Sequence, residues 1–401
     1  MSTPLLDGLT VLDFTRVLAG PYCTRLLADL GARVIKVERP GEGDDTRRGY
    51  LQLDEARADQ ATYFVRVNAG KLSVGIDLSR PDGRAVALDF ARIADVAIEN
   101  FVPGVVAKLG VGAADLRAIN PRLVYCSISG FGQDGPLAGW PAFAHIINAM
   151  SGLMDLERNG DATPRVGYLQ AADVLAGTHA FGAILAALVR RGRTGEGATL
   201  DVSMLQALVA AEDVSYGAAL NGGEISQGPR VGMIIGEVKG RHVVTQYVGG
   251  PQLWTRLCGV MNRPDIADDP RFATPLLRRQ HWSELRALLT DWLSRSFGSV
   301  DEALSTLNGA RLPAAPVLSP REVIEHPHMR ARQAFPEIPH QGRGSVRVTA
   351  TPFHVDGQPL RPAGPAPWRI GEHTREVLTK VLGYPAERID ALRAAGAIAE
   401  P

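Results

Sequence analysis

Short apolar runs alternate with amphipathic stretches over the first third of the chain. LTVLDF (Leu9–Phe14) is an apolar run of strand length, and TRLLADLG at residues 24–31 repeats its leucines at helical spacing before a glycine. ARVIKVERP then predicts a second strand that ends at Glu38, parallel to the first, because an antiparallel return would not need the helix. The alternation continues to about Phe131. It predicts an α/β fold with a doubly wound parallel sheet.

The rest of the chain predicts one long helix and a smaller domain. The sequence VLAGTHAFGAILAALVRR, directly after Asp173, predicts one long, largely buried helix, and ATLDVSM then returns as a strand. Residues 216–334 differ in character, with Gly/Pro turns, three tryptophans and two helical hairpins. We therefore expect a large domain at residues 1–215, to which residues 335–401 return, and a smaller α+β domain at residues 216–334.

Composition narrows the classes of function. The chain has 401 residues, of which 45% are hydrophobic, so two domains are expected. Lys+Arg and Asp+Glu both number 43, which leaves no overall field to recruit nucleic acid or an anionic membrane. The first residues lack the basic and apolar regions of a signal peptide, and the most apolar stretch, residues 180–189, is too short to span a bilayer. We expect a cytoplasmic protein with neither nucleic acid nor membrane as a partner.

Two kinds of cofactor site are not indicated. A dinucleotide site needs a G-x-G-x-x-G turn after the first strand, but the turn here reads TRVLAGPY, with a single glycine. The nine histidines form no H-x-x-x-H pair, and the three cysteines are scattered, so no metal site is predicted. We expect no tightly bound cofactor.

Three charged residues lie where chemistry is possible. Asp173 precedes the long helix, where it is either an N-cap or a reactive carboxylate stabilised by the helix N-terminus, with Gly177 letting a ligand approach the backbone. Arg39 and Lys108 follow predicted strands, where they either meet phosphates or are ordinary surface charges. The residue types alone leave these alternatives open.

Several segments together resemble the class III CoA-transferase family (CaiB/BaiF type), which includes formyl-CoA transferases, carnitine CoA-transferases and α-methylacyl-CoA racemases. They occur in the family's order over nearly the whole chain. They read LTVLDFTRVLAGPYCTRLLADLGARVIKVERPGEGDDTR, NAGKLSVGIDL, ADVAIENFVPG, NPRLVYCSISGFGQDGP, NAMSGLM, ADVLAGTHAFGAILAALVRRGRTGEGATLDVSML and GEHTREVL.

The resemblance implies a fold, an assembly and a set of site residues. It implies a Rossmann-like large domain built from both chain ends, a small domain, and a homodimer whose two subunits interlock. It places the nucleophile on Asp173 and makes acyl-CoA and small carboxylic acids the substrates. The implied CoA contacts are Val17, Leu18, Ala19, Arg39, Ile76, Asp77, Leu78, Ser79, Asn100, Phe101, Val102 and Lys108.

Two departures from the family bear on the reaction. The histidine that serves racemases of this family as a second acid/base falls on Phe143 here, with His145 two residues away. Formyl-CoA transferases carry a long glycine run over the active site, whereas this chain has only Gly249-Gly250 before Pro251. The first departure argues against a racemase, and the second argues against formyl-CoA and oxalate as substrates.

Three functions remain in consideration. The first is a CoA-transferase that passes CoA from an acyl-CoA to a carboxylic acid through an aspartyl anhydride and an aspartyl-CoA thioester on Asp173. The second is an acyl-CoA racemase that exchanges the α-proton. The third is a regulatory protein that binds CoA without catalysis, against which an intact Asp173 argues. Succinyl-CoA with a dicarboxylate is the default substrate pair within the family, and Arg16 and Arg165 are candidates for binding the acid.

Overall fold

The chain forms two compact units, and each is described here by itself. The first unit comprises Met1–Asp155, Arg165–Gly222 and Pro327–Pro401, and the second comprises Leu156–Pro164 and Gly223–His326. The second unit covers most of the predicted small domain, residues 216–334. The computed structural model describes residues 3–49, 51–54, 56–158, 161–212, 214–225, 230–248, 250 and 252–401.

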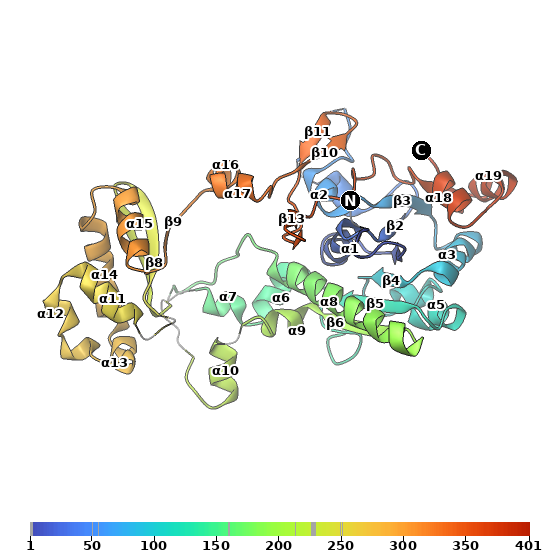
Figure 1. Ribbon diagram of the computed structural model, residues 1–401. Helices are drawn as coiled ribbons and strands as arrows, with labels where there is room; N and C mark the ends of the chain where they lie inside the picture. Colours follow the sequence, from blue (N-terminus) through green and yellow to red (C-terminus); the bar gives the residue numbers. More distant parts are fainter. Residues whose placement is uncertain are drawn as a thin grey trace. The chain divides into compact units, whose positions relative to one another are not determined.

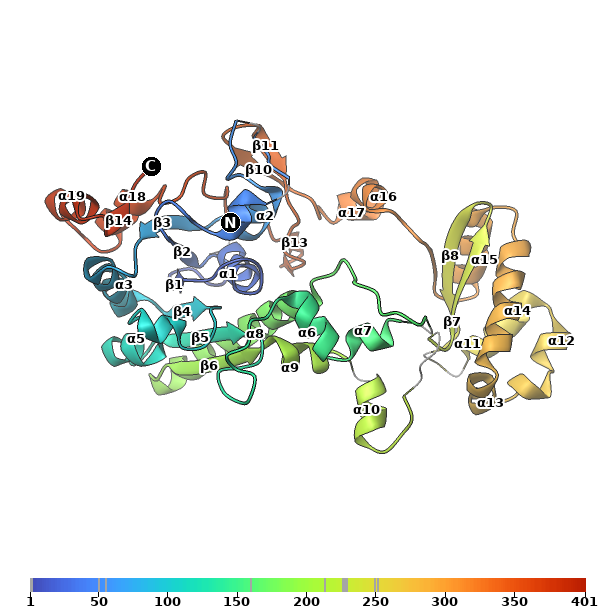
Figure 2. The same cartoon turned by 180° about the vertical axis from the view of Figure 1, so that it is seen from behind.

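A seven-stranded sheet forms the centre of the first unit, in the order β14-β3-β2-β1-β4-β5-β6 (Figures 1 and 2). All neighbouring strands are parallel except β14, which pairs antiparallel with β3 and brings the chain's last residues back to the sheet. The strands are β1 (Thr10–Asp13), β2 (Arg33–Glu38), β3 (Leu72–Ile76), β4 (Val96–Glu99), β5 (Val124–Ser129), β6 (Ala198–Ser203) and β14 (Ile398–Ala399). The predicted α/β fold with a large parallel sheet is confirmed.

Helices cover both faces of this sheet because successive strand residues point to opposite sides. Val11 joins a core with α1, α8 and α9, whereas its neighbour Leu12 joins a second core with α3, α5, α18 and α19. These helices are α1 (Ala19–Asp29), α3 (Pro81–Ile93), α5 (Ala113–Ile119), α8 (Ala171–Thr194), α9 (Met204–Val209), α18 (Thr374–Lys380) and α19 (Ala386–Ala394).

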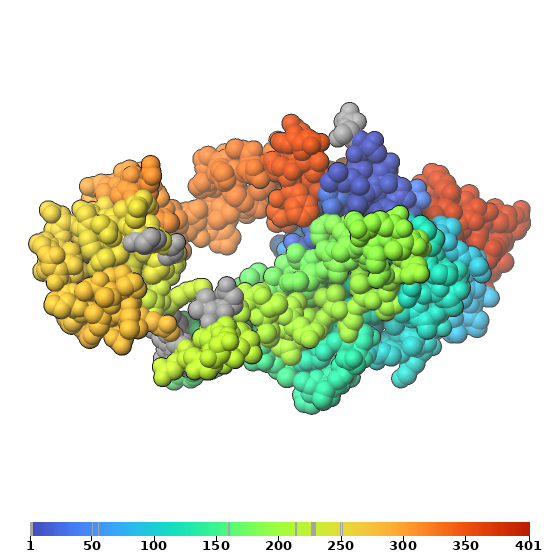
Figure 3. Space-filling model, turned by 60° about the horizontal axis from the view of Figure 1, so that its bottom comes forward, coloured from blue at the N-terminus to red at the C-terminus, as the bar shows by residue number. Residues whose placement is uncertain are grey.

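Helix α8 differs from its prediction at its start and in its length. It begins at Ala171, so Asp173 lies within its first turn and not before it. Its 24 residues are long and apolar enough, by length and composition, to cross a bilayer, although the sequence predicted too short a stretch. In the structure its stripe of small and apolar residues packs in the core beside α1 and β5, while its other side lies at the surface (green in Figure 3).

Shorter elements complete the first unit. They include a helix, α2, in the segment between β2 and β3, and two small hairpins in the C-terminal segment. These elements are η1 (Asp45–Arg48), α2 (Thr62–Asn68), α4 (Val105–Lys108), α6 (Ala144–Met150), α7 (Leu153–Leu156), α10 (Val214–Leu220), α17 (Pro327–Ala331), β10 (Glu337–His340), β11 (Gly344–Arg347), β12 (His354–Val355) and β13 (Gln358–Pro359).

The second unit packs helices against a three-stranded antiparallel sheet, β7-β8-β9. Its core includes two large aromatic side chains of α14, Trp282 and Trp292, which are 6% and 5% exposed. The elements are β7 (Met233–Val238), β8 (Arg241–Gln246), α11 (Leu253–Met261), α12 (Pro264–Ala267), η2 (Pro270–Phe272), α13 (Pro275–Gln280), α14 (Trp282–Arg295), α15 (Val300–Gly309), β9 (Ala314–Pro316) and α16 (Pro320–Glu325).

Candidate active site

Asp173 lies in the first turn of α8, where the residue before the helix, Gln170, makes no side-chain cap. Of the two roles that the residue types left open for Asp173, the N-cap does not hold, because an N-cap residue precedes the helix. Its carboxylate is half-buried and lines a hollow of about 330 Å³. The unpaired N–H groups of the first turn stabilise a negative charge there.

The carboxyl group of Asp173 is hard to ionise for an aspartate. Burial raises its pKa to about 6, although hydrogen bonds from the backbone N–H of Ala19 and from its own N–H, and the charge of His145, oppose the shift. At neutral pH the group is therefore a carboxylate with a reduced water shell. Such a carboxylate is a better nucleophile than a fully hydrated one.

The turn that carries Ala19 is held in a strained conformation. Val17 has φ 68°, a left-handed conformation that a β-branched residue rarely adopts and that costs about 1–3 kcal/mol. Its N–H donates to Oδ1 of Asp44 at 3.3 Å. The neighbouring Arg16 is fixed on both sides, since its N–H donates to Asn100 Oδ1 and its carbonyl accepts from Asn100 Nδ2, both at 2.8 Å. Side chains from two other loops thus determine where the Ala19 N–H points.

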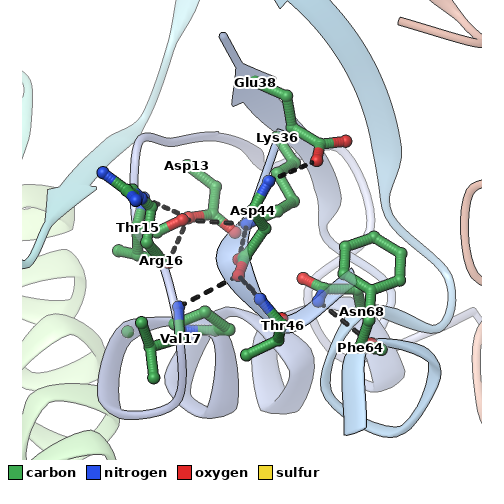
Figure 4. Close-up of polar contacts among 12 residues, drawn as sticks. Asp13, Thr15, Arg16, Val17, Lys36, Glu38, Asp44, Thr46, Phe64 and Asn68 are labelled. Atoms are coloured by element: carbon green, nitrogen blue, oxygen red, sulfur yellow. Dashed lines mark hydrogen bonds and ion pairs between the residues drawn. The ribbon is translucent and has the colours of Figure 1, made fainter. Parts of the chain in front are cut away.

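Asp44 connects this turn to the buried charge of Lys36 on β2 (Figure 4). Lys36 Nζ donates to Asp44 Oδ2 at 2.9 Å and to the carbonyl of Thr15 at 2.8 Å, and both charged side chains are almost fully buried. Burial alone would raise the pKa of Asp44, but the charge of Lys36 and hydrogen bonds from Thr46 outweigh it and lower the pKa to about 2. Asp44 therefore stays ionised and paired, and it anchors the turn to the sheet.

Two glycines allow the backbone to pack closely at this turn. A Cβ on Gly177 of α8 would lie 2.5 Å from the carbonyl oxygen of Ala19, and one on Gly20 would lie 2.2 Å from Cγ2 of Thr15. Gly177 was predicted to let a ligand approach the helix. Here it is the start of α1 that comes close, and this contact brings the Ala19 N–H within reach of Asp173.

A second hollow, of about 270 Å³, lies at the carboxyl ends of β2 and β3 and shares Arg16 and Phe101 with the hollow of Asp173. Ligands of open parallel sheets bind outside the carboxyl ends of the strands. Among the predicted CoA contacts, those that line this hollow are Arg39, Ile76, Asp77, Leu78, Ser79 and Phe101.

The other predicted contacts divide into two groups. Four of them line the hollow of Asp173: Val17, Ala19, Asn100 and Val102. Leu18 is 1% exposed in the core, and Lys108 is exposed on α4, so neither lines a hollow described here. The roles of all these residues in binding CoA remain predictions.

The family model of CoA-transferase family III matches residues 6–374 of this chain. The chain belongs to this family. It is 34% identical over 399 residues to the succinyl-CoA:glutarate CoA-transferase of Mus musculus, and the match covers 98% of this chain and 90% of the relative. The formyl-CoA:oxalate CoA-transferase of Rhodopseudomonas palustris (strain BisA53) is 30% identical over 434 residues, with 100% and 98% covered.

A solved structure of a CaiB/BaiF family protein from Brucella suis is similar in fold. It superposes with a TM-score of 0.78 at 31% sequence identity, and the match covers 94% of this chain and 100% of that chain. The family that the sequence segments predict is confirmed.

Three family-dependent predictions concern other residues. Phe143 is 69% exposed and lines the hollow of Asp173, and His145 is close enough for its charge to act on that carboxylate. Gly249 and Pro251 lie outside the described residues. Arg16 is the only cationic residue among the described residues that line the hollow, and Arg165 does not line it.

Sequence reasoning missed a tyrosine beside the site. Tyr63 of α2 donates to Gln170 Oε1 at 2.7 Å, and Gln170 directly precedes α8. Burial raises the pKa of Tyr63 to about 12, and the nearby charge of Asp173 adds to the shift, so the hydroxyl stays protonated. Tyr63 lies 107 residues before Gln170 in the sequence. No sequence spacing therefore indicates that Tyr63 and Asp173 lie near each other.

Proposed function

We propose that this protein is a CoA-transferase that moves CoA from an acyl-CoA to a carboxylic acid, with Asp173 as the nucleophile. The observation that carries the proposal is a half-buried carboxylate at a helix N-terminus, in a hollow that shares two lining residues with a second hollow at the strand ends. The second hollow has room for part of a CoA, and the first would hold the thioester.

Each step of the proposed mechanism conserves atoms and charge. A carboxylate oxygen of Asp173 attacks the thioester carbon of the donor, the C–S bond breaks, and CoA leaves as a thiolate. The thiolate attacks the aspartyl carbonyl of the resulting anhydride, which releases the donor acid and forms an aspartyl-CoA thioester. The acceptor carboxylate then attacks this thioester, whose C–S bond breaks to give a second anhydride and CoA thiolate. The thiolate attacks the acceptor's carbonyl carbon in this anhydride, which forms the new acyl-CoA and frees the carboxylate of Asp173. Ala19 supplies a backbone N–H that stabilises the carboxylate when it is released.

A dicarboxylate is the acceptor that the site favours, with succinyl-CoA as the donor. Relatives named for succinyl-CoA and glutarate support this pair, although others are named for formyl-CoA and oxalate. Arg16 would pair with the second carboxylate, because a guanidinium binds carboxylates in a bidentate fashion. Its present partner, Asp45, is an exposed neighbour in the same hollow that the substrate would displace.

The test traps the covalent intermediate. Incubation with succinyl-CoA followed by hydroxylamine should convert Asp173 to a hydroxamate, and peptide mass spectrometry should find the added mass on the peptide that contains it. Asp173→Asn should carry no adduct and should transfer CoA at least about a thousandfold more slowly. Turnover by the wild-type protein without a label on Asp173 would contradict the mechanism.

An acyl-CoA racemase is the second candidate function, and the position of His145 favours it, since its charge acts on Asp173. A racemase exchanges the α-proton with solvent and needs no acceptor acid. Incubation of 2-methylacyl-CoA in D₂O, with and without a dicarboxylic acid, distinguishes the two functions. Deuterium at the α-carbon without the acid would favour the racemase, and CoA transfer to the acid without deuterium would favour the transferase.

A further inference from the structure

A third hollow lies between the β10–β11 hairpin and the segment that precedes α18. Its volume is about 390 Å³, which is within the range of small-molecule sites. It shares no lining residue with the two hollows of the candidate active site. The residues that line it are Pro339, His340, Gln341, Gly344, Pro365, Ala366, Trp368, Glu372 and His373.

His340, the last residue of β10, is a buried polar group without a partner. It is 7% exposed, and within the described part of the chain neither of its ring nitrogens has a hydrogen-bond partner. Its ring meets the Trp368 ring edge-on, with centroids 5.0 Å apart. Folded proteins pair nearly all buried polar groups, so an imidazole that lines a hollow and lacks a partner indicates a group that enters from outside.

The protonation of His340 determines which groups it can bind. Burial lowers its pKa, and the charge of Asp54 opposes this only in part. The ring is therefore neutral near pH 7, with one nitrogen as a donor and the other as an acceptor.

Three other polar residues line this hollow, and one of them, Gln341, donates from Nε2 to Glu372 Oε1 at 3.4 Å. Nδ1 of His373 accepts the backbone N–H of Ser73 at 3.2 Å, so the neutral ring carries its proton on Nε2 and can offer it as a donor. The carboxylate of Glu372 is held in place by the backbone N–H groups of Trp368 and Arg369. The hollow thus offers one acceptor and two donors from its histidines, beside a fixed negative charge.

We propose that this hollow binds a small, neutral, planar molecule that carries a hydrogen-bond donor next to an acceptor, such as a primary amide. The donor of the ligand meets the free acceptor of His340, and its acceptor meets the N–H groups of His340 and His373. Trp368, Pro339 and Pro365 contribute apolar lining against which a flat ring can pack. An anion is disfavoured by the fixed carboxylate of Glu372.

The test compares two probes with the same ring, benzamide and benzoate, on the full-length protein. Imidazole NMR resonances of histidine-labelled protein are assigned to His340 by their loss in His340→Phe. Benzamide should shift these resonances and raise the melting temperature, and benzoate should do neither. His340→Phe keeps the ring volume without polar atoms, so it should weaken benzamide binding at least tenfold while CoA transfer is unchanged and the melting temperature is equal or higher.

Two variants complete the test. His340→Gln keeps one donor and one acceptor and should retain binding, which covers the case in which the phenylalanine variant fails to fold. His242→Phe changes an exposed histidine of β8 in the second unit and should bind benzamide like the wild type. The proposal is overturned if benzamide leaves the His340 resonances unchanged, if benzoate binds equally well, or if binding survives in His340→Phe. None of these results affects the assignment of Asp173.

Discussion

At the scale of single residues, the reactivity of the site depends on how little water surrounds one carboxylate. Burial raises the pKa of Asp173, and the Ala19 N–H and the helix N-terminus limit the rise. A fully exposed aspartate would be ionised but well hydrated, and a fully buried one would stay protonated. The intermediate environment gives a carboxylate that is ionised at neutral pH and still reactive.

The raised pKa of Asp173 predicts an acid limit of activity near pH 6. Only the carboxylate attacks a thioester, so kcat/KM should fall about tenfold per pH unit below about pH 6. A pH profile with succinyl-CoA and a dicarboxylate whose own pKa values lie below 5.5 measures this limit. A limit near pH 4 would mean that the carboxyl group is as hydrated as a free aspartate.

The same shift predicts how Asp173 affects stability. Because its folded-state pKa is raised above the unfolded value, its stabilising contribution is fully present below about pH 4 and is lost as pH rises through about 6. Asp173→Asn removes this dependence and should therefore gain stability relative to the wild type between pH 4 and pH 8. Urea unfolding of both proteins at pH 4 and pH 8 measures the difference between their free energies of unfolding. The same difference at both pH values would contradict this prediction.

Asp44 provides a prediction about the anchored turn. Asp44→Asn leaves Lys36 buried without its partner charge, which should lower the free energy of unfolding by about 3 kcal/mol or more. It should also move the acid limit of activity to higher pH, because the turn no longer holds the Ala19 N–H at Asp173. Asp45→Asn is the matched stability control, since its pair with Arg16 is exposed and should contribute less than about 1 kcal/mol.

At the scale of elements, the site depends on the close packing of α1 against α8. The first strand of the sheet leads into the strained turn, α1 begins at Ala19, and Asp173 lies one turn before Gly177 on α8. The glycine lets the two helices approach until a backbone N–H of one reaches a side chain of the other. The geometry around the Asp173 carboxylate therefore depends on the packing of a helix pair.

Gly177→Ala should push these helices apart, because the new Cβ would lie 2.5 Å from a carbonyl oxygen. We expect a loss of about 1–3 kcal/mol in the free energy of unfolding and a marked drop in kcat. Gly182→Ala is the matched control on the same helix: no atom lies within 4 Å of its Cβ position, so it should be neutral or stabilising by up to about 1 kcal/mol. Equal effects of the two changes would show that the helix contact is unimportant.

At the scale of the whole molecule, the first unit leaves large apolar side chains in contact with solvent. Trp140, Phe143, Tyr168 and Leu169 are each more than half exposed, at 57%, 69%, 106% and 69%. Exposed apolar side chains in such number are typical of a surface that another chain covers. We propose that a second copy of the chain covers them, in the interlocked homodimer that the family resemblance implies.

An interlocked homodimer predicts subunits that do not exchange. Light scattering should give twice the mass of the 42.9 kDa chain. When tagged and untagged proteins are mixed, no mixed dimer should form over days, because one chain must unfold before it can leave the other. Unfolding and refolding the mixture together should produce the mixed dimer. Rapid exchange without denaturant would exclude interlocking, though not a simple dimer.

The sequence alone determined the fold class and the family, and it singled out Asp173 as the candidate nucleophile. The hydrophobic patterns of strands and helices extend over only a few neighbouring residues, so they can be recognised in the sequence. Their alternation along the chain predicted the large parallel sheet. The segments that resemble the family are also short stretches of sequence, and one of them contains Asp173. The exact start of α8 was not predicted, because helix boundaries depend on caps and contacts that the hydrophobic pattern does not contain.

Only the tertiary structure decided which distant residues meet. Tyr63 reaches Gln170 across 107 residues, Asp44 holds the turn of Val17, and the hollow at His340 joins a hairpin to the segment before α18. Burial is also a tertiary quantity, and it sets the pKa of Asp173 and leaves His340 without a partner. Such contacts leave no periodic trace in the sequence, since each depends on how separate elements pack together.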